Sequence, residues 1–228
     1  MGKLSNRIAF ITGAGTGLGR AIAIAFAKEG ATVALNGRRE EALREVQAEI
    51  GEKQAIILPA DVTDQSAIHA TRDKLLAATG GQLDIVVNNV GGVPTLNSIS
   101  ELTLDEWKQM INLNLTSQFI VANAFLPALR KNGNGKLISV TSALASSYME
   151  TYGAYSASKA GVEALMKTLA IEEEKNGIQV NIFDPIYFTS EGNPDTDIDP
   201  ADIVAILIDL AATSSIEKSG EVVKPLKA

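Results

Sequence analysis

The sequence contains no cysteine and a single histidine, His69. Without cysteine the chain cannot form disulfides, thiolate zinc sites or iron–sulfur clusters, and it has no cysteine nucleophile. One histidine offers little to a metal ion, so we expect no metal site.

Basic residues are also few, with 20 Lys and Arg against 27 Asp and Glu, a net charge of −7. That balance argues against a nucleic-acid partner, because a phosphate backbone attracts positive charge. The chain has no apolar run of about 18 residues, the length that suggests a membrane span, and its first residues do not resemble a signal peptide. We therefore expect a cytoplasmic protein that binds neither nucleic acid nor membrane.

Short runs rich in Val and Ile alternate with longer segments of helical period throughout the 228 residues. No linker rich in Pro, Gly or Ser interrupts them, which favours one domain, residues 1–228. The seven predicted strands are residues 7–12, 32–36, 54–59, 83–88, 136–141, 178–183 and 221–225. The predicted helices lie near 18–29, 40–50, 64–79, 103–131, 153–176 and 200–213.

Several strands are apolar on both faces, including residues 8–11 and 85–87. Such strands need helices on both sides of the sheet, which is the parallel arrangement. We predict a doubly wound α/β fold with a seven-stranded, mainly parallel sheet and helices on both faces. Residues 186–200 are polar, acidic and without period, so we expect a loop there that contacts the substrate.

The turn from the first strand into the first helix reads TGAGTGLG, residues 12–19. Glycine allows positive φ and lets backbone N–H groups approach a pyrophosphate at the positive end of a helix. The spacing is G-x-x-x-G-x-G, through Gly13, Gly17 and Gly19, and no Gly-Lys-Ser/Thr follows as in a Walker loop. This turn predicts a Rossmann-type dinucleotide site, and a glycine-rich turn without a ligand is the alternative.

The end of the second strand bears on the choice of cofactor. A fold of this kind that selects NAD carries an acid there, about 20 residues beyond the glycines. Here the chain reads Asn36-Gly37-Arg38-Arg39, with no acid before Glu40. Two guanidiniums suit a 2′-phosphate, which favours NADP(H) over NAD(H). The alternative is that both arginines are solvated surface charges.

Tyr155 and Lys159 are four residues apart in a predicted helix and therefore project from the same face. A nearby ammonium stabilises a phenolate and lowers the pKa of a tyrosine, which suits general acid/base chemistry. Ser142 follows the strand 136–141, where its hydroxyl can point across the same cleft. Each residue alone also has a structural interpretation, as a helix pair or as a cap.

Together these residues resemble the short-chain dehydrogenase/reductase family from about residue 3 to residue 185. The matching motifs are TGAGTGLG at 12–19, Asp61-Val62, NNVG at 88–91, Asn114 in INLNLTSQF, Ser142, and YSASK at 155–159. The resemblance implies a catalytic tetrad of Asn114, Ser142, Tyr155 and Lys159. Tyr155 would donate a proton to the substrate oxygen, and Ser142 would hydrogen-bond the same atom. Lys159 would bind the nicotinamide ribose and lower the tyrosine pKa, and Asn114 would support a water relay behind the lysine.

The resemblance also implies which residues contact the cofactor. Asp61 and Val62 would flank the adenine, and Asn88 and Gly91 would line the cleft at the carboxyl edge of the sheet. The full implied set is Gly13, Thr16, Gly17, Leu18, Gly19, Arg38, Arg39, Asp61, Val62, Asn88, Gly91, Tyr155, Lys159, Pro185 and Thr189.

Three positions near the implied cofactor site depart from the family pattern. Val90 stands where the family has alanine, which adds bulk beside the cofactor. Ile186 follows Pro185 where glycine is usual, and we expect it to shift the nicotinamide ring or narrow the pocket. An unusual Asp184 precedes the proline.

The substrate loop is short. Thr189 matches a family threonine, but few residues separate it from Pro200, where most members have a longer helical lid. We expect a shallow or open substrate pocket. The carboxylates of this loop favour neutral or cationic carbonyl substrates over anionic ones.

We predict an NADP(H)-preferring oxidoreductase that interconverts a carbonyl and a secondary alcohol on a small or acyl-type substrate. A cofactor-binding regulator or sensor with little turnover is the alternative, because the substrate loop is reduced. A serine hydrolase is a weaker alternative, since the chain lacks G-x-S-x-G and His69 is its only imidazole. In the family the helices that match 103–131 and 153–176 pair across a two-fold axis, so we expect a homodimer or homotetramer.

Overall fold

Seven strands form one sheet in the computed structural model of the chain, which describes residues 1–185, 200–213 and 219–225. The strands are β1 (Ile8–Thr12), β2 (Thr32–Gly37), β3 (Ala55–Pro59), β4 (Ile85–Asn88), β5 (Lys136–Val140), β6 (Gln179–Phe183) and β7 (Val222–Val223). Their order is β3-β2-β1-β4-β5-β6-β7, and each neighbouring pair is parallel. The predicted sheet is confirmed. Strand β7 is shorter than predicted, and Pro225 has no N–H with which to continue the ladder.

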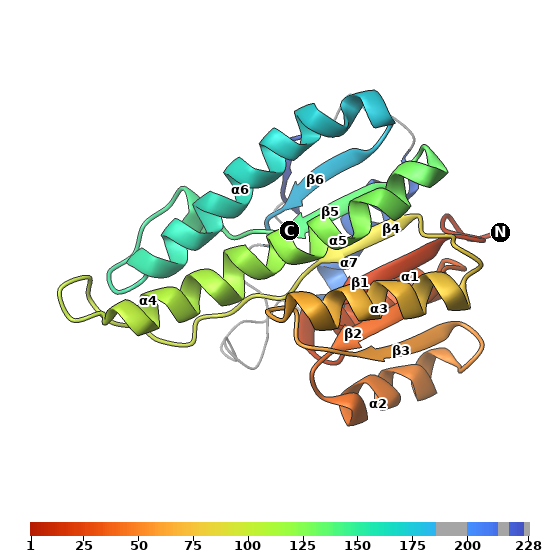
Figure 1. Ribbon diagram of the computed structural model, residues 1–228, viewed down its shortest axis with the longest axis horizontal. Coiled ribbons are helices and arrows are strands. Elements are labelled where there is room, and N and C mark those ends of the chain that lie inside the picture. The colour runs from red at the N-terminus through yellow and green to blue at the C-terminus, as the bar shows by residue number, and fades with distance from the viewer. Residues whose placement is uncertain (186–199, 214–218, 226–228) are drawn as a thin grey trace.

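Helices cover both faces of the sheet (Figure 1). They are α1 (Gly17–Lys28), α2 (Glu40–Ile50), α3 (Gln65–Ala78), α4 (Leu104–Ile111), α5 (Ser117–Asn132), α6 (Gly153–Glu173) and α7 (Pro200–Ala212). Helices α3, α5 and α6 pack on one face, and α1, α2 and α7 pack on the other. The strand order changes direction between β1 and β4, and ligands of such sheets bind outside the carboxyl ends at this switch point.

The two layers bury separate apolar cores because the strands are apolar on both faces. In β1, Ala9 and Ile11 pack toward α1, while Phe10 points to the opposite side and stacks on Phe125 of α5 with ring centroids 4.3 Å apart. The continuous apolar runs in the sequence follow from this double coverage.

Side-chain caps are present at the starts of α3 and α4. The Asp64 carboxylate accepts a hydrogen bond from the Ala67 N–H at the start of α3. Thr103 and Glu106 form a reciprocal capping box at the start of α4.

The helix predicted near 103–131 is present but is interrupted at Asn114, the residue whose side chain leaves open a bend of the helix. A π-helical segment, Asn112–Thr116, lies between α4 and α5. Asn114 sits inside it, and its Nδ2 donates to the Met110 carbonyl at 3.1 Å, one turn earlier. A side chain that competes for a backbone carbonyl loosens the ladder locally, and π segments of this kind often occur at functional sites. Helix α6 likewise ends earlier than predicted, in a single 3₁₀ turn, Glu174–Asn176.

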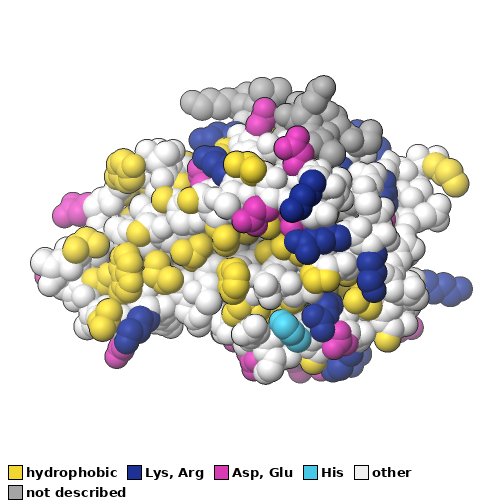
Figure 2. Space-filling view, turned by 45° about the horizontal axis from the view of Figure 1, so that its top comes forward, with side chains coloured by type: hydrophobic (Ala, Val, Ile, Leu, Met, Phe, Trp, Pro, Cys, Tyr) yellow, Lys and Arg dark blue, Asp and Glu magenta, His cyan; other side chains and the backbone are white. Residues whose placement is uncertain are grey.

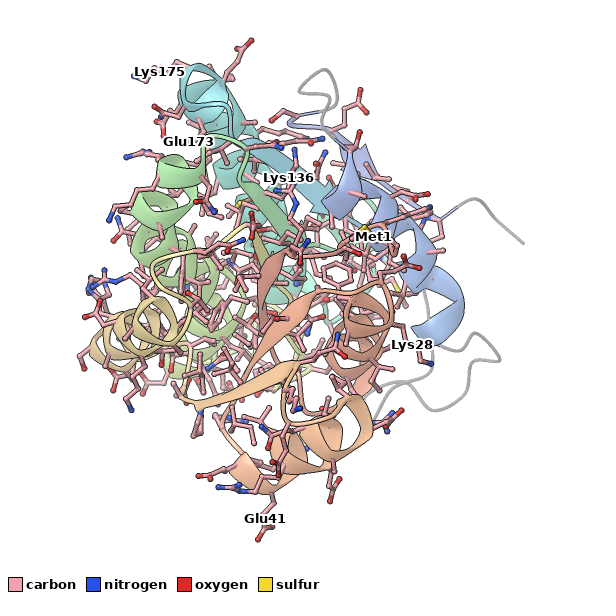
Figure 3. The ribbon with its side chains drawn as sticks, turned by 90° about the vertical axis from the view of Figure 1, so that its right-hand side faces the viewer. Met1, Lys28, Glu41, Lys136, Glu173 and Lys175 are labelled. Carbon is pink, nitrogen blue, oxygen red and sulfur yellow. The ribbon has the colours of Figure 1, made fainter. Side chains whose placement is uncertain are left out.

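Polar ties strengthen the amino-terminal edge of the sheet (Figure 3). Arg130 of α5 holds the buried carboxylate of Glu173 at the end of α6, with Nε 2.9 Å from Oε2. Lys136, at the start of β5, donates to Gln179 Oε1 at 2.9 Å, and burial lowers the pKa of this lysine to about 8. The opposite, carboxyl edge carries the predicted site residues. Within the described ranges, no helix is both long and apolar enough to cross a membrane.

Candidate active site

The turn between β1 and α1 adopts the tight path that its glycines predict. Gly13 and Gly17 have φ of +67° and +51°. A Cβ on Gly19 would lie 2.1 Å from the Gly13 carbonyl oxygen, so no side chain fits there. The first turn of α1 has neither a side-chain cap nor an acidic residue. Its N–H groups are therefore arranged as in a helix terminus that receives phosphate.

The segment after β4 is fastened to this turn. Thr12 Oγ1 accepts from the Asn89 and Val90 N–H groups at 2.9 and 3.1 Å, and Asn89 Nδ2 donates to the Thr12 carbonyl at 2.9 Å. The Asn89 amide also lies where side chains on Gly13 and Gly19 would extend. These contacts explain why both positions are glycine, and they fix the two loops at the switch point relative to each other.

A hollow of about 510 Å³ opens beside the glycine turn. It is lined by Gly15, Thr16, Arg39, Glu40, Glu41, Ala42 and Glu45. Arg39 is exposed and occupies the position before the first residue of α2, and Arg38 is exposed next to it. Arg44 forms an ion pair with Glu40, which offsets part of the negative charge at this rim. The structure thus brings Arg39 together with the glycine turn, as the sequence predicts for a cofactor site.

Three other residues that are predicted to contact the cofactor have side chains that pack or form hydrogen bonds within the protein. Val62 is buried in the core under α3 and α5. Asn88 is buried as well, and its Nδ2 donates to the Gln118 carbonyl at 2.8 Å. Asp61 accepts from the backbone and hydroxyl of Thr63 at 2.9 and 2.7 Å. These contacts hold the carboxyl ends of β3 and β4 in place.

Asn114 is fully buried and binds the loop after β4 through both ends of its amide. Its Oδ1 accepts from the Gly92 N–H at 2.8 Å, and its Nδ2 donates to the Gly92 carbonyl at 2.8 Å. The π segment and the loop are thereby joined beside Gly91. A Cβ on Gly91 would lie 2.9 Å from Asn114 Oδ1 and 2.9 Å from Lys159 Nζ.

Lys159 lies on α6 and has only 2% of its surface exposed. Its Nζ donates to the Val140 carbonyl at the end of β5, at 3.1 Å, and lies 5.7 Å from the centroid of the Tyr155 ring. Burial lowers the pKa of Lys159 to about 8, and the Asp184 carboxylate opposes that shift. Tyr155 is half-buried one turn earlier and meets the Tyr152 ring edge-on at 6.2 Å.

Ser142 is half-buried and begins the 3₁₀ turn Ala143–Ala145, which follows β5 and packs against α6. Its Oγ accepts from the Leu144 N–H at 3.3 Å. Pro185 is buried just beyond β6. The remaining predicted residue of this group, Thr189, lies outside the described residues, as do Ile186 and the acidic residues up to 199 for which the sequence predicts a loop.

Sequence reasoning overlooked two contributions to this edge. Thr12 and Asn89 stood in the recognised motifs but were given no part in holding the loops together. The available signal was a polar residue at the end of one buried parallel strand and another directly after its neighbour, because the carboxyl ends of parallel strands meet at one edge of the sheet.

Comparison with known proteins agrees with this geometry. The sequence profile of the short chain dehydrogenase family matches residues 7–200. An uncharacterized oxidoreductase of Staphylococcus aureus strain MW2 is 32% identical over 233 residues, which cover 99% of this chain and 100% of that protein. A 3β-hydroxysteroid dehydrogenase of Mediterraneibacter gnavus is 34% identical over 93% of this chain and 76% of that protein.

A crystal structure of a dehydrogenase/reductase from Sinorhizobium meliloti 1021 superposes with a TM-score of 0.90 at 30% identity, over 97% of this chain and 94% of that one. The chain belongs to the short-chain dehydrogenase/reductase family of oxidoreductases.

We predict that Gly91 and its neighbour Gly92 differ sharply in their tolerance of alanine. A Cβ on Gly91 would press on Asn114 Oδ1 and Lys159 Nζ at 2.9 Å, whereas at Gly92 the nearest atom is Leu113 Cδ2 at 3.8 Å. Gly91→Ala should lower the free energy of unfolding by about 1–3 kcal/mol, the usual cost of overpacking. Gly92→Ala should be neutral or slightly stabilising. Urea unfolding of both variants tests this, and equal stabilities would contradict the packing described.

Proposed function

We propose that the protein is a nicotinamide-dependent oxidoreductase that interconverts a carbonyl and a secondary alcohol, with NADP(H) preferred over NAD(H). The observation that carries the proposal is the buried Lys159 ammonium beside the Tyr155 ring, at the carboxyl end of β5 and close to Gly91. The similarity to a protein named 3β-hydroxysteroid dehydrogenase supports the alcohol–carbonyl class.

The residues present fit a dinucleotide. The uncapped first turn of α1 would supply N–H groups to a pyrophosphate. A Cβ on Gly17 would meet no neighbouring group within 4 Å, so there is open space above the turn. Arg39 at the rim of the 510 Å³ hollow would meet the 2′-phosphate. When bound, the cofactor supplies the hydride donor or acceptor, which no amino-acid side chain provides.

The tetrad of side chains would carry out the proton chemistry. Tyr155 donates its phenolic proton to the carbonyl oxygen during reduction and takes it back during oxidation. Ser142 donates a hydrogen bond to the same oxygen from the neighbouring turn. Lys159 binds the nicotinamide ribose and stabilises the phenolate by its charge. Asn114 keeps the loop at Gly92 in place behind the lysine and supports the proton relay there.

The alternative is a cofactor-binding regulator or sensor with little turnover. It shares the glycine turn and the hollow, but it has no use for a lysine buried beside a tyrosine. A buried ammonium costs stability, so its presence favours the enzyme.

Replacing Tyr155 tests the proton donor. Tyr155→Phe keeps the ring and its edge contact but removes the hydroxyl, so kcat should fall by about 10²–10⁴-fold, the range of general acid catalysis. NADPH affinity, measured by fluorescence titration, should stay within a few fold. The matched control is Tyr152→Phe, which removes a hydroxyl from the adjacent ring and should retain kcat. A Tyr155→Phe variant with undiminished kcat would refute the mechanism.

Replacing Arg39 tests the choice of cofactor. The wild type should have a higher kcat/KM with NADPH than with NADH, and Arg39→Ala should lose roughly ten- to a hundredfold of that preference, since a charge-assisted contact contributes about 1.5–3 kcal/mol. Arg38→Ala should lose less, because Arg39 lines the hollow. Arg72→Ala, on α3, is the control and should change nothing. An unmutated protein that uses NADH as well as NADPH would overturn the assignment.

Large apolar side chains exposed on the helices support the proposal of a homodimer or homotetramer. Leu104 of α4, Phe119 of α5 and Ile171 of α6 are all exposed. Figure 2 shows apolar side chains gathered on the left half of the molecule, the half in which Figure 1 shows α4. Light scattering should give two or four times the chain mass of 24.0 kDa. Ile171→Glu should shift the mass toward one chain, whereas Ala48→Glu, on the exposed side of α2, should not. A single-chain mass for the wild type at micromolar concentration would contradict assembly.

A further inference from the structure

The buried carboxylate of Asp184 is unexplained by the tetrad, and Asp184 is one of the positions at which the sequence departs from the family pattern. It follows β6 directly and has 1% of its surface exposed. Its N–H donates to the Val223 carbonyl at 2.9 Å, and its Oδ2 lies 3.0 Å from Nζ of Lys224. An acid inside a sheet edge costs stability unless its charge is used or compensated.

The strand pattern places this carboxylate on the side of the sheet that α6 covers. Phe183 packs into the core with α1 and α7, while Val180 and Ile182 pack into the core with α5 and α6. Side chains alternate between the faces of a strand, so Asp184 shares the face of Ile182.

The neighbouring strand links that face to Lys159. The Thr141 N–H donates to the Phe183 carbonyl at 2.8 Å, and Thr141 Oγ1 approaches the Lys159 carbonyl at 3.5 Å. Val140, which binds the Lys159 ammonium, pairs in register with Phe183. Asp184 therefore lies one residue beyond the partner of Val140, whose carbonyl holds the lysine.

Three elements carry the titratable groups that bear on Lys159, directly or through Asp184. Tyr155 and Glu163 are on α6, and Glu163 is engaged with Thr141 at 3.3 Å and with Lys167 at 3.3 Å. Asp184 follows β6, and Lys224 follows β7. Burial lowers the pKa of Lys159, and among its neighbours it is Asp184 that raises it.

We propose that Asp184 is a positioning residue that keeps Lys159 protonated, and that its ion pair with Lys224 tunes this effect from β7. The proposal rests on the proposed function, in which the charge of Lys159 is needed. With a pKa near 8 the lysine is charged at neutral pH by a narrow margin. Without a nearby negative charge it would lose its proton in the working range, and the tyrosine would lose its cation.

Asp184→Asn tests the proposal, because it keeps the shape of the side chain and removes its charge. The alkaline limb of kcat for ketone reduction should move down by about one pH unit, the smallest shift expected for loss of an opposite charge. The titration midpoint of Lys159, followed by NMR in protein labelled with carbon-13 at lysine Cε, should fall by the same amount. Asp184→Glu should restore both values in part.

The matched control is Asp84→Asn. Asp84 is also buried and is paired with Arg7 at 3.1 Å, but it lies at the opposite edge of the sheet. The Asp84→Asn variant should leave the titration midpoint of Lys159 and the pH profile of kcat unchanged. Lys224→Met should move both upward, because it removes a positive charge that opposes protonation of the lysine.

An unchanged Lys159 midpoint in Asp184→Asn overturns this proposal even if the enzyme is active. A wild type without turnover overturns the proposed function, and the NMR titration then still decides the role of Asp184. If Asp184→Asn does not fold, Lys224→Met decides: an upward shift supports the proposal, and no shift overturns it.

Discussion

The hydrogen bond from the Lys159 ammonium to the Val140 carbonyl, 3.1 Å long, joins α6 to the carboxyl end of β5 inside the protein. It sets the height of the Tyr155 ring above the sheet, because the two residues lie one helical turn apart. It also explains why Gly91 has no side chain, since a Cβ there would meet the ammonium. A charge buried this deeply is costly, and the surrounding structure is arranged to compensate for that cost.

Two fastenings keep the loops around this ammonium in position. On one side Thr12 and Asn89 tie the segment after β4 to the glycine turn. On the other side Asn114 ties the same segment, at Gly92, to the π-helical stretch between α4 and α5. The proposed phosphate cradle and the proposed proton donor are thereby parts of one rigid edge. This arrangement suits a reaction in which a bound dinucleotide and a substrate must be held at a fixed separation.

Much of this arrangement could be predicted from the sequence. Continuous apolar runs predicted the parallel sheet, and the spacing of Tyr155 and Lys159 predicted their shared helix face. A bend of the helix at Asn114 could be expected, since an asparagine there competes for the Met110 carbonyl one turn earlier. The bonds from Asn114 to Gly92 could not be predicted, because that loop is distant in sequence. For the same reason, the bond from the buried Asn88 amide to the Gln118 carbonyl could not be predicted. Such outcomes depend on tertiary packing, which a local pattern does not contain.

Hydride transfer at the carboxyl edge of the sheet is the central claim, and transfer of an isotope from NADPH to the substrate tests this claim. The wild-type protein would be incubated with a panel of neutral ketones and with NADPH that carries deuterium at both hydrogen positions of the nicotinamide C4, and the alcohols would be analysed by mass spectrometry. We predict alcohol that carries one deuterium on its carbinol carbon. NADPH binding without deuterated alcohol from any ketone would contradict hydride transfer at this edge and favour the alternative of a cofactor-binding regulator or sensor.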